Sequence, residues 1–132
     1  SPWTTLRQTW MDLLAPTQQY MAQTDRIAQR LLQLDGPILT ERLSGIEAAQ
    51  GRKVEVEVSA LGRLMDKGVW DSTRFVGDLR RARWNYVLTT SAHNAPFGDS
   101  WVFQDALKDG YSPTHEVFEL GGFEVVLWQA AR

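Results

Sequence analysis

The sequence predicts an α/β protein: a sandwich resembling three layers, with a mixed sheet that has a parallel centre and a C-terminal antiparallel hairpin. Helical and strand patterns interleave in the middle of the chain, as they do in α/β folds. A continuous apolar run in Trp84–Thr90 follows a helical pattern, which is typical of a buried parallel strand. Two further apolar runs, Thr114–Leu120 and Phe123–Gln129, flank Gly121-Gly122. Both glycines tolerate positive φ, so this segment is expected to form a tight hairpin.

Composition limits the protein to a few classes. The chain has 132 residues, 43% of them apolar, a formal net charge of −2 and no cysteine. This length can bury a real core, and the composition is that of an ordinary globular domain. Without cysteine there is no disulfide, thiolate zinc site or cysteine nucleophile. The near-neutral charge disfavours nucleic acid as a partner, because phosphate neutralisation requires a clustered basic surface.

The N-terminal region has two helical patterns. Thr4–Leu14 carries apolar residues at near-helical spacing, and a second amphipathic pattern runs over Thr17–Leu34, with Tyr20, Ile27, Leu31 and Leu34 in an apolar stripe that is expected to face the sheet. Pro16 is expected to close the first helix, because proline interrupts the helical hydrogen bonds. We therefore divide the chain into an amphipathic helix over residues 1–16, a candidate juxtamembrane segment, and a single α/β domain over residues 17–132. The chain begins with Ser1 and is expected to be a processed chain or a domain of a longer protein.

The remaining elements are shorter. Strict alternation of valine with charged residues over Lys53–Val58 predicts a strand with one solvated face. Glycine, serine and aspartate mark the ends of the other segments. These are a strand at 37–40, a loop or short helix at 41–49, helices at 60–67, about 72–83 and 101–108, and a turn at 109–110.

No motif with explicit catalytic or cofactor chemistry occurs in the sequence. Gly-x-Gly-x-x-Gly, the phosphate-binding P-loop and His-Glu-x-x-His are absent, so we assign no catalytic residue, no metal ligand and no cofactor. Glu55 and Glu57 lie two apart on the alternating strand and are interpreted as its solvated face. Arg80, Arg81 and Arg83 either complement the dipole of the preceding helix or hold an anionic headgroup.

One loop is a candidate ligand site. Residues 91–100 follow the predicted central strand, at the edge where open α/β sheets bind ligands. The loop brings together His93, Asn94 and Asp99, and Trp101 next to it could form an aromatic wall for a sugar ring or a prenyl-linked group. The alternative is that polar residues with proline and glycine simply make a connection. His115 is interpreted as an ordinary surface histidine.

A series of short motifs runs through residues 25–128 in a fixed order. They are Gly36–Glu41, Gly51–Val54, Leu61, Leu64, Gly68, Trp70-Asp71, Phe75, Leu79 and Tyr86–Thr89, followed by Tyr111, Gly121–Phe123 and Val125–Trp128. This order resembles the soluble C-terminal region of bacterial multi-pass membrane glycosyltransferases of the GT-C type, a group similar to dolichyl-phosphate-mannose-protein mannosyltransferases. Residues 4–16 match no motif of that family.

The resemblance implies a non-catalytic accessory domain on the extracytoplasmic side of a bacterial membrane, periplasmic or at the cell surface. The parent enzyme would transfer sugar from a polyprenyl-phosphate donor, and its catalytic acids would lie among the membrane helices and not in this chain. The implied partners are the membrane-embedded remainder of the same chain and a sugar acceptor or lipid-phosphate headgroup. Two alternatives stay open: a free-standing small-molecule binding or regulatory domain, and an independent hydrolase or transferase.

Overall fold

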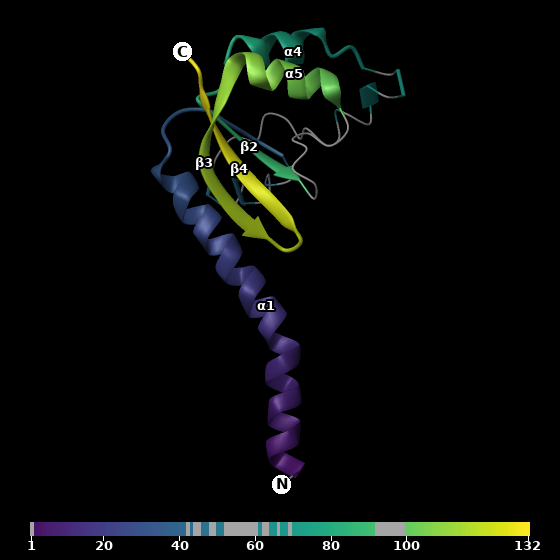
Figure 1. Cartoon of the computed structure of the whole chain (residues 1–132), viewed down its shortest axis with the longest axis vertical. Coiled ribbons are helices and arrows are strands. Elements are labelled where there is room, and N and C mark those ends of the chain that lie inside the picture. The colour runs from purple at the N-terminus through teal and green to yellow at the C-terminus, as the bar shows by residue number, and fades with distance from the viewer. Residues whose placement is uncertain are drawn as a thin grey trace.

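The protein has an α/β fold with a four-stranded mixed sheet (Figure 1). The computed structural model describes residues 2–41, 43, 46–47, 50–51, 61, 64–65, 67–68, 70–91 and 100–132, with the backbone alone at 2–3, 10–16 and 91. In chain order the elements are α1 (Pro2–Gln33), β1 (Ile38–Thr40), α4 (Thr73–Arg80), β2 (Tyr86–Ser91), α5 (Trp101–Gly110), β3 (Tyr111–Leu120) and β4 (Phe123–Ala130).

The N-terminal region forms one helix and not the two that were predicted. α1 continues through Pro16 for 32 residues. Proline removes one helical hydrogen bond and costs about 3 kcal/mol inside a helix. Strong helix formers flank it on both sides, Leu14-Ala15 before and Gln18-Gln19 after, so the helix bends and resumes. Figure 1 shows the axis of α1 changing direction along its N-terminal part.

The strands lie in the order β1-β2-β4-β3. β1 pairs with β2 in parallel, with Leu39 opposite Val87, whereas β2–β4 and β4–β3 are antiparallel. The predicted C-terminal hairpin is confirmed, and Gly121 at its turn has a φ of 60°. β3 begins earlier than expected, because α5 extends to Gly110 and passes directly into the strand without the predicted turn.

Helices cover both faces of the sheet, which gives three layers. Consecutive strand residues point to opposite faces: Ile38 and Leu88 pack on the α1 side, whereas Leu39 and Val87 pack on the side of α4 and α5. The α1 side also buries Ile27, Leu31, Leu34, Leu43, Val125 and Leu127. The other core consists mainly of Phe75, Leu79, Ala82, Trp84, Phe103, Ala106, Leu107, Tyr111 and Trp128.

Several predicted elements are only partly described. The predicted strand Lys53–Val58 lies outside the described residues. Helical residues occur at 46–47, 61 and 64–65, inside the segments where short helices were expected. α4 ends at Arg80, earlier than predicted, and the chain turns at Ala82, which has a φ of 53°.

Candidate functional site

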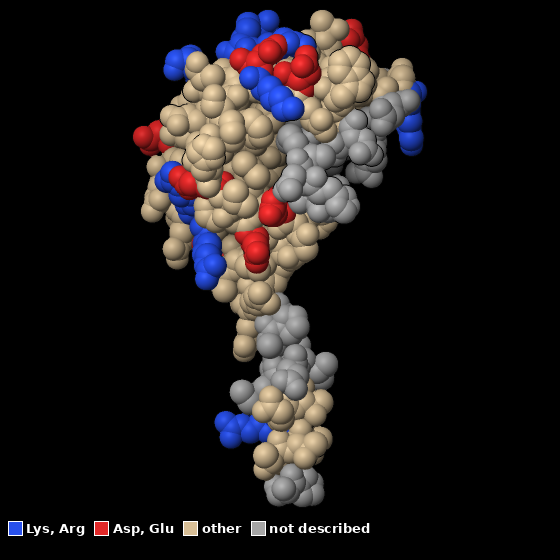
Figure 2. Space-filling view, viewed as in Figure 1, with Lys and Arg blue, Asp and Glu red and all other residues tan. Residues whose placement is uncertain are grey.

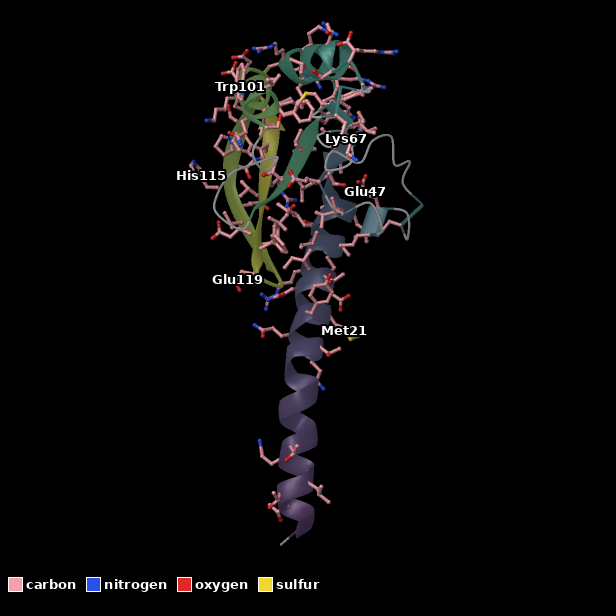
Figure 3. All side chains as sticks on the ribbon, turned by 90° about the vertical axis from the view of Figure 1, so that its right-hand side faces the viewer. Met21, Glu47, Lys67, Trp101, His115 and Glu119 are labelled. Atoms are coloured by element: carbon pink, nitrogen blue, oxygen red, sulfur yellow. The ribbon has the colours of Figure 1, made fainter. Side chains whose placement is uncertain are left out.

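Only the two ends of the predicted ligand loop, Ser91 and Ser100, belong to the described residues. His93, Asn94 and Asp99 lie outside the described residues, so no geometry relates them to one another. Trp101 is described as the first residue of α5, where its side chain is 73% exposed (Figure 3). Ser100 caps this helix by accepting a 3.4 Å hydrogen bond from the Phe103 amide. Trp101 is therefore at the surface, as an aromatic wall would have to be.

A buried polar cluster occupies the carboxyl ends of β1 and β2, which sequence reasoning missed. Glu41 and Glu47 are 4% and 3% exposed. The Thr90 hydroxyl donates a 3.0 Å hydrogen bond to Glu41 Oε1, and the Thr40 hydroxyl donates to Glu47 Oε1. These bonds offset part of the cost of burying carboxylates and hold the segment after β1 against the sheet. The prediction of a loop or short helix at 41–49 gave no sign that its glutamates would be buried.

The described part of the chain contains no group of three or more histidine, cysteine, aspartate or glutamate residues that could hold a metal ion. Within the polar cluster, the Thr40 and Thr90 hydroxyls each contact one carboxylate. These two hydrogen bonds attach the segment that follows β1 to the sheet, and strand threonines supply both donors.

The basic cluster predicted near the end of α4 is neutralised by acidic neighbours. Arg80 contacts Asp105 and Asp109, while Arg81 and Arg83 both contact Asp78, at 3.1 and 3.5 Å. Acidic and basic side chains are accordingly intermixed over this end of the molecule (Figure 2). Ion pairing, more than the helix dipole, thus accounts for these arginines.

The N-terminal part of α1 extends away from the rest of the molecule (Figures 1 and 3). All described side chains at residues 4–9 and 17–22 are exposed. Among them are three large apolar ones: Leu6, Tyr20 and Met21 are 54%, 51% and 60% exposed. Tyr20 was predicted to share the buried stripe with Ile27 and Leu31, but it lies where the helix leaves the body.

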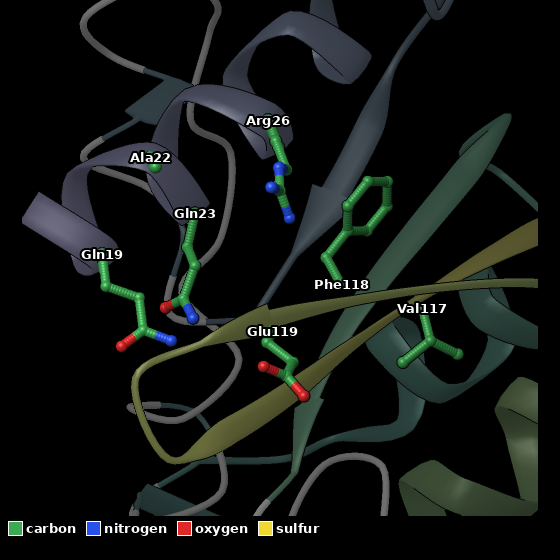
Figure 4. A pocket seen from close by; sticks show the side chains of 7 residues that line it. All are labelled: Gln19, Ala22, Gln23, Arg26, Val117, Phe118 and Glu119. Atoms are coloured by element: carbon green, nitrogen blue, oxygen red, sulfur yellow. The ribbon is translucent and has the colours of Figure 1, made fainter.

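A groove of about 400 Å³ lies where α1 leaves the body, between the helix and β3 (Figure 4). Polar and apolar side chains line it: Gln19, Ala22, Gln23, Arg26, Val117, Phe118 and Glu119. Gln23 fixes one end, because its Oε1 accepts a 2.9 Å hydrogen bond from the Gly121 amide at the hairpin turn. Gln23 and Arg26 extend from α1 toward β3, so the groove presents both amide and guanidinium groups (Figure 4).

An ion pair on the same side of the molecule anchors α1 to β3. Arg30 donates two hydrogen bonds to Glu116, from Nε to Oε2 and from Nη2 to Oε1, each 2.8 Å long. The hydrogen bond from Arg30 lowers the pKa of Glu116, and the same bond raises the pKa of Arg30. This two-point geometry fixes the direction in which α1 departs from the sheet.

None of the described helices combines the length and the hydropathy needed to span a bilayer. Comparison with protein-family models, curated proteins and solved structures finds no match for this chain. The resemblance to membrane glycosyltransferases therefore rests on the sequence motifs given above.

Proposed function

We propose that this chain is a non-catalytic accessory domain of a membrane glycosyltransferase that uses a polyprenyl-phosphate sugar donor. In this proposal the domain lies on the extracytoplasmic side of a bacterial membrane, and α1 docks it onto the membrane-embedded remainder of the same protein. Sugar transfer itself belongs to that remainder, in keeping with the sequence resemblance.

The observation that carries the proposal is the exposed N-terminal part of α1. An isolated helix is marginal in water, and helices in proteins owe most of their stability to packing of an apolar face. The C-terminal part of α1 has such packing, through Ile27 and Leu31. The N-terminal part exposes Leu6, Tyr20 and Met21 instead. A partner that covers these side chains would give the N-terminal part of α1 the packing that the sheet gives the C-terminal part.

The charge of α1 indicates what kind of partner this is. From residue 2 to residue 24 the sequence has only two charged residues, Arg7 and Asp12. Helices that lie on anionic lipid carry many lysine and arginine residues along their polar face, whereas residues 2–24 of α1 have a single basic residue, Arg7. Threonine and glutamine make up most of its polar positions, and these side chains suit hydrogen bonding to neighbouring protein helices. The chemistry favours the protein part of a membrane enzyme over its lipid surroundings.

Two observations on the gene and the intact protein test the proposal. The reading frame upstream of Ser1 is expected to encode several apolar stretches of about 20 residues, the length that spans a bilayer. The intact protein in membranes is expected to transfer sugar from a polyprenyl-phosphate donor. A start codon close to Ser1, or membranes without such transfer, would refute the proposed function.

A matched pair of variants tests the role of α1. Leu6→Asp places a negative charge on the exposed apolar face, whereas Gln8→Asp places the same charge on the opposite face of the helix. Leu6→Asp is expected to lower sugar transfer by the intact enzyme at least about tenfold, because it desolvates a charge at the docking surface. Gln8→Asp should leave transfer close to that of the unmodified enzyme. Equal activity of the two variants would show that α1 does not dock.

A further inference from the structure

A second hollow lies at the opposite end of the body, next to α4. Its volume is about 240 Å³, below the range of pockets that hold drug-sized ligands. Residues from three stretches of the chain line it: Leu61; Trp70, Asp71, Arg74, Phe75 and Asp78; and Arg83 and Trp84. It shares no residue with the groove of α1 or with the buried polar cluster.

Aromatic rings form the wall of this hollow and hold one another in place. Phe75 and Trp84 are almost fully buried, with their ring centroids 5.8 Å apart. The partly exposed ring of Trp70 packs against Phe75 at 6.0 Å and against Phe103 at 6.4 Å. Such ring pairs add to the stability gained from burial, so the orientation of Trp70 is fixed by the core. Trp70 therefore offers a rigid apolar surface at the hollow.

The rim carries both signs of charge in fixed positions. The Asp71 carboxylate accepts hydrogen bonds from the amide and the hydroxyl of Thr73, at 2.9 and 2.6 Å, and the hydroxyl bond is the main cause of its lowered pKa. The Arg83 guanidinium lies 5.3 Å from the ring centroid of Trp84 and 3.5 Å from Asp78. Arg74 is exposed and has no acidic partner among the described residues.

We propose that this hollow binds a single neutral sugar ring. A pyranose has an apolar face of C–H groups, which suits an aromatic side chain, and an edge of hydroxyl groups, which both donate and accept hydrogen bonds. Asp71 can accept from such hydroxyls and Arg74 can donate to them. Two aspartates and two arginines on the rim cancel in charge, so the site favours neither a phosphate nor a cation. This inference does not depend on the proposed function, since none of the residues that line the hollow belongs to α1.

Nuclear magnetic resonance titration of the 132-residue chain tests the site. The probes are the methyl glycosides of mannose, glucose, galactose and N-acetylglucosamine, with inorganic phosphate as the comparison. At least one glycoside is expected to shift the Trp70 indole N–H signal, saturating at millimolar concentration, and phosphate is expected to leave it unchanged. The Trp70 signal is assigned by its loss in Trp70→Phe.

Three variants make the outcome decisive. Trp70→Ala is expected to weaken glycoside binding about tenfold, because the stacking surface is lost. Arg74→Ala, a change at an exposed side chain, should weaken it about threefold with an unchanged melting temperature. Leu32→Ala removes an exposed apolar side chain of α1 that does not line the hollow and should leave the affinity unchanged. Absence of shifts with every glycoside, an equal response to phosphate, or full affinity in Arg74→Ala would overturn the proposal.

Discussion

The Tyr111 hydroxyl gives the sharpest test of how this fold is held together. Tyr111 is 2% exposed at the junction of α5 and β3, and its hydroxyl donates a 2.8 Å hydrogen bond to the Trp84 carbonyl. The same hydroxyl accepts a 3.0 Å hydrogen bond from the Trp84 amide. One oxygen thus serves a buried backbone donor and a buried backbone acceptor just before β2. Tyr111→Phe removes that oxygen and leaves the ring in place.

The expected loss follows from these two bonds. A buried polar group that loses its partner costs about 1–3 kcal/mol, and because the two groups affected by Tyr111→Phe are both neutral we take about 1–2 kcal/mol for each. We therefore expect the free energy of unfolding to fall by about 2–4 kcal/mol. In a chain of this length each kcal/mol corresponds to about 4 °C in melting temperature, so the midpoint should drop by about 8–16 °C.

Urea denaturation followed by tryptophan fluorescence measures this difference, with Tyr86→Phe as the matched control. The Tyr86 side chain is partly buried in the core beside α1, but its hydroxyl makes no hydrogen bond to the described residues. Its removal should change the free energy of unfolding by less than about 0.5 kcal/mol. Equal losses for Tyr111→Phe and Tyr86→Phe would refute the reasoning, because they would show that the two backbone contacts contribute nothing measurable.

The same residue predicts a dependence on alkaline pH. Burial raises the pKa of Tyr111 to about 12, against an ordinary value of 10.0. The folded state therefore keeps a proton that the unfolded state loses, and the resulting stability is fully present below pH 10 and disappears as pH rises toward 12. Tyr111→Phe should unfold with a flatter dependence on pH over this range. A tyrosinate absorbance titration should show one of the three tyrosines ionising late.

Three further predictions use the same denaturation assay. Leu31→Asp, at a fully buried position, should lose at least about 4 kcal/mol or unfold the domain, whereas Gln29→Asp on the exposed face should lose less than about 0.5 kcal/mol. Gly110→Ala should lose about 2–3 kcal/mol because its Cβ would lie 2.0 Å from a backbone oxygen of α4, whereas Gly77→Ala meets only a movable side chain and should be neutral or stabilising. Glu116→Gln should cost about 1 kcal/mol or less at neutral pH, and it should flatten the loss of stability below the ordinary carboxyl pKa, because the lowered pKa of Glu116 makes that contribution fade in acid.

Elements whose local sequence pattern agrees with their packing in the core were predictable from the sequence. The apolar run at the centre of β2 packs into both hydrophobic cores: Val87 faces α4 and α5, and Leu88 faces α1. The hairpin was predictable because glycine tolerates the positive φ that its turn requires at residue 121, which most other residues disfavour. In both places local chemistry and tertiary packing favour the same conformation.

Features that depend on a distant partner were not predictable. Glutamate is ordinarily exposed, and the donor that accompanies the burial of Glu41, Thr90, lies 49 residues further along the chain. Pro16 signalled the end of a helix by its own chemistry, but α1 continues through it to Gln33.

α1 shows why a correct pattern can still leave its function open. Apolar residues recur at helical spacing on both sides of Pro16, so their spacing alone does not tell the buried part of the helix from the exposed part. In the structure Ile27 and Leu31 are fully buried against the sheet, while Leu6 and Tyr20 on the same helix are about half exposed. The periodicity indicates an apolar face that is stabilised by packing, and the sheet packs against only part of the helix. The exposed remainder is therefore the surface at which a partner would gain most by binding, which is why the docking proposal depends on Leu6 more than on any residue of the core.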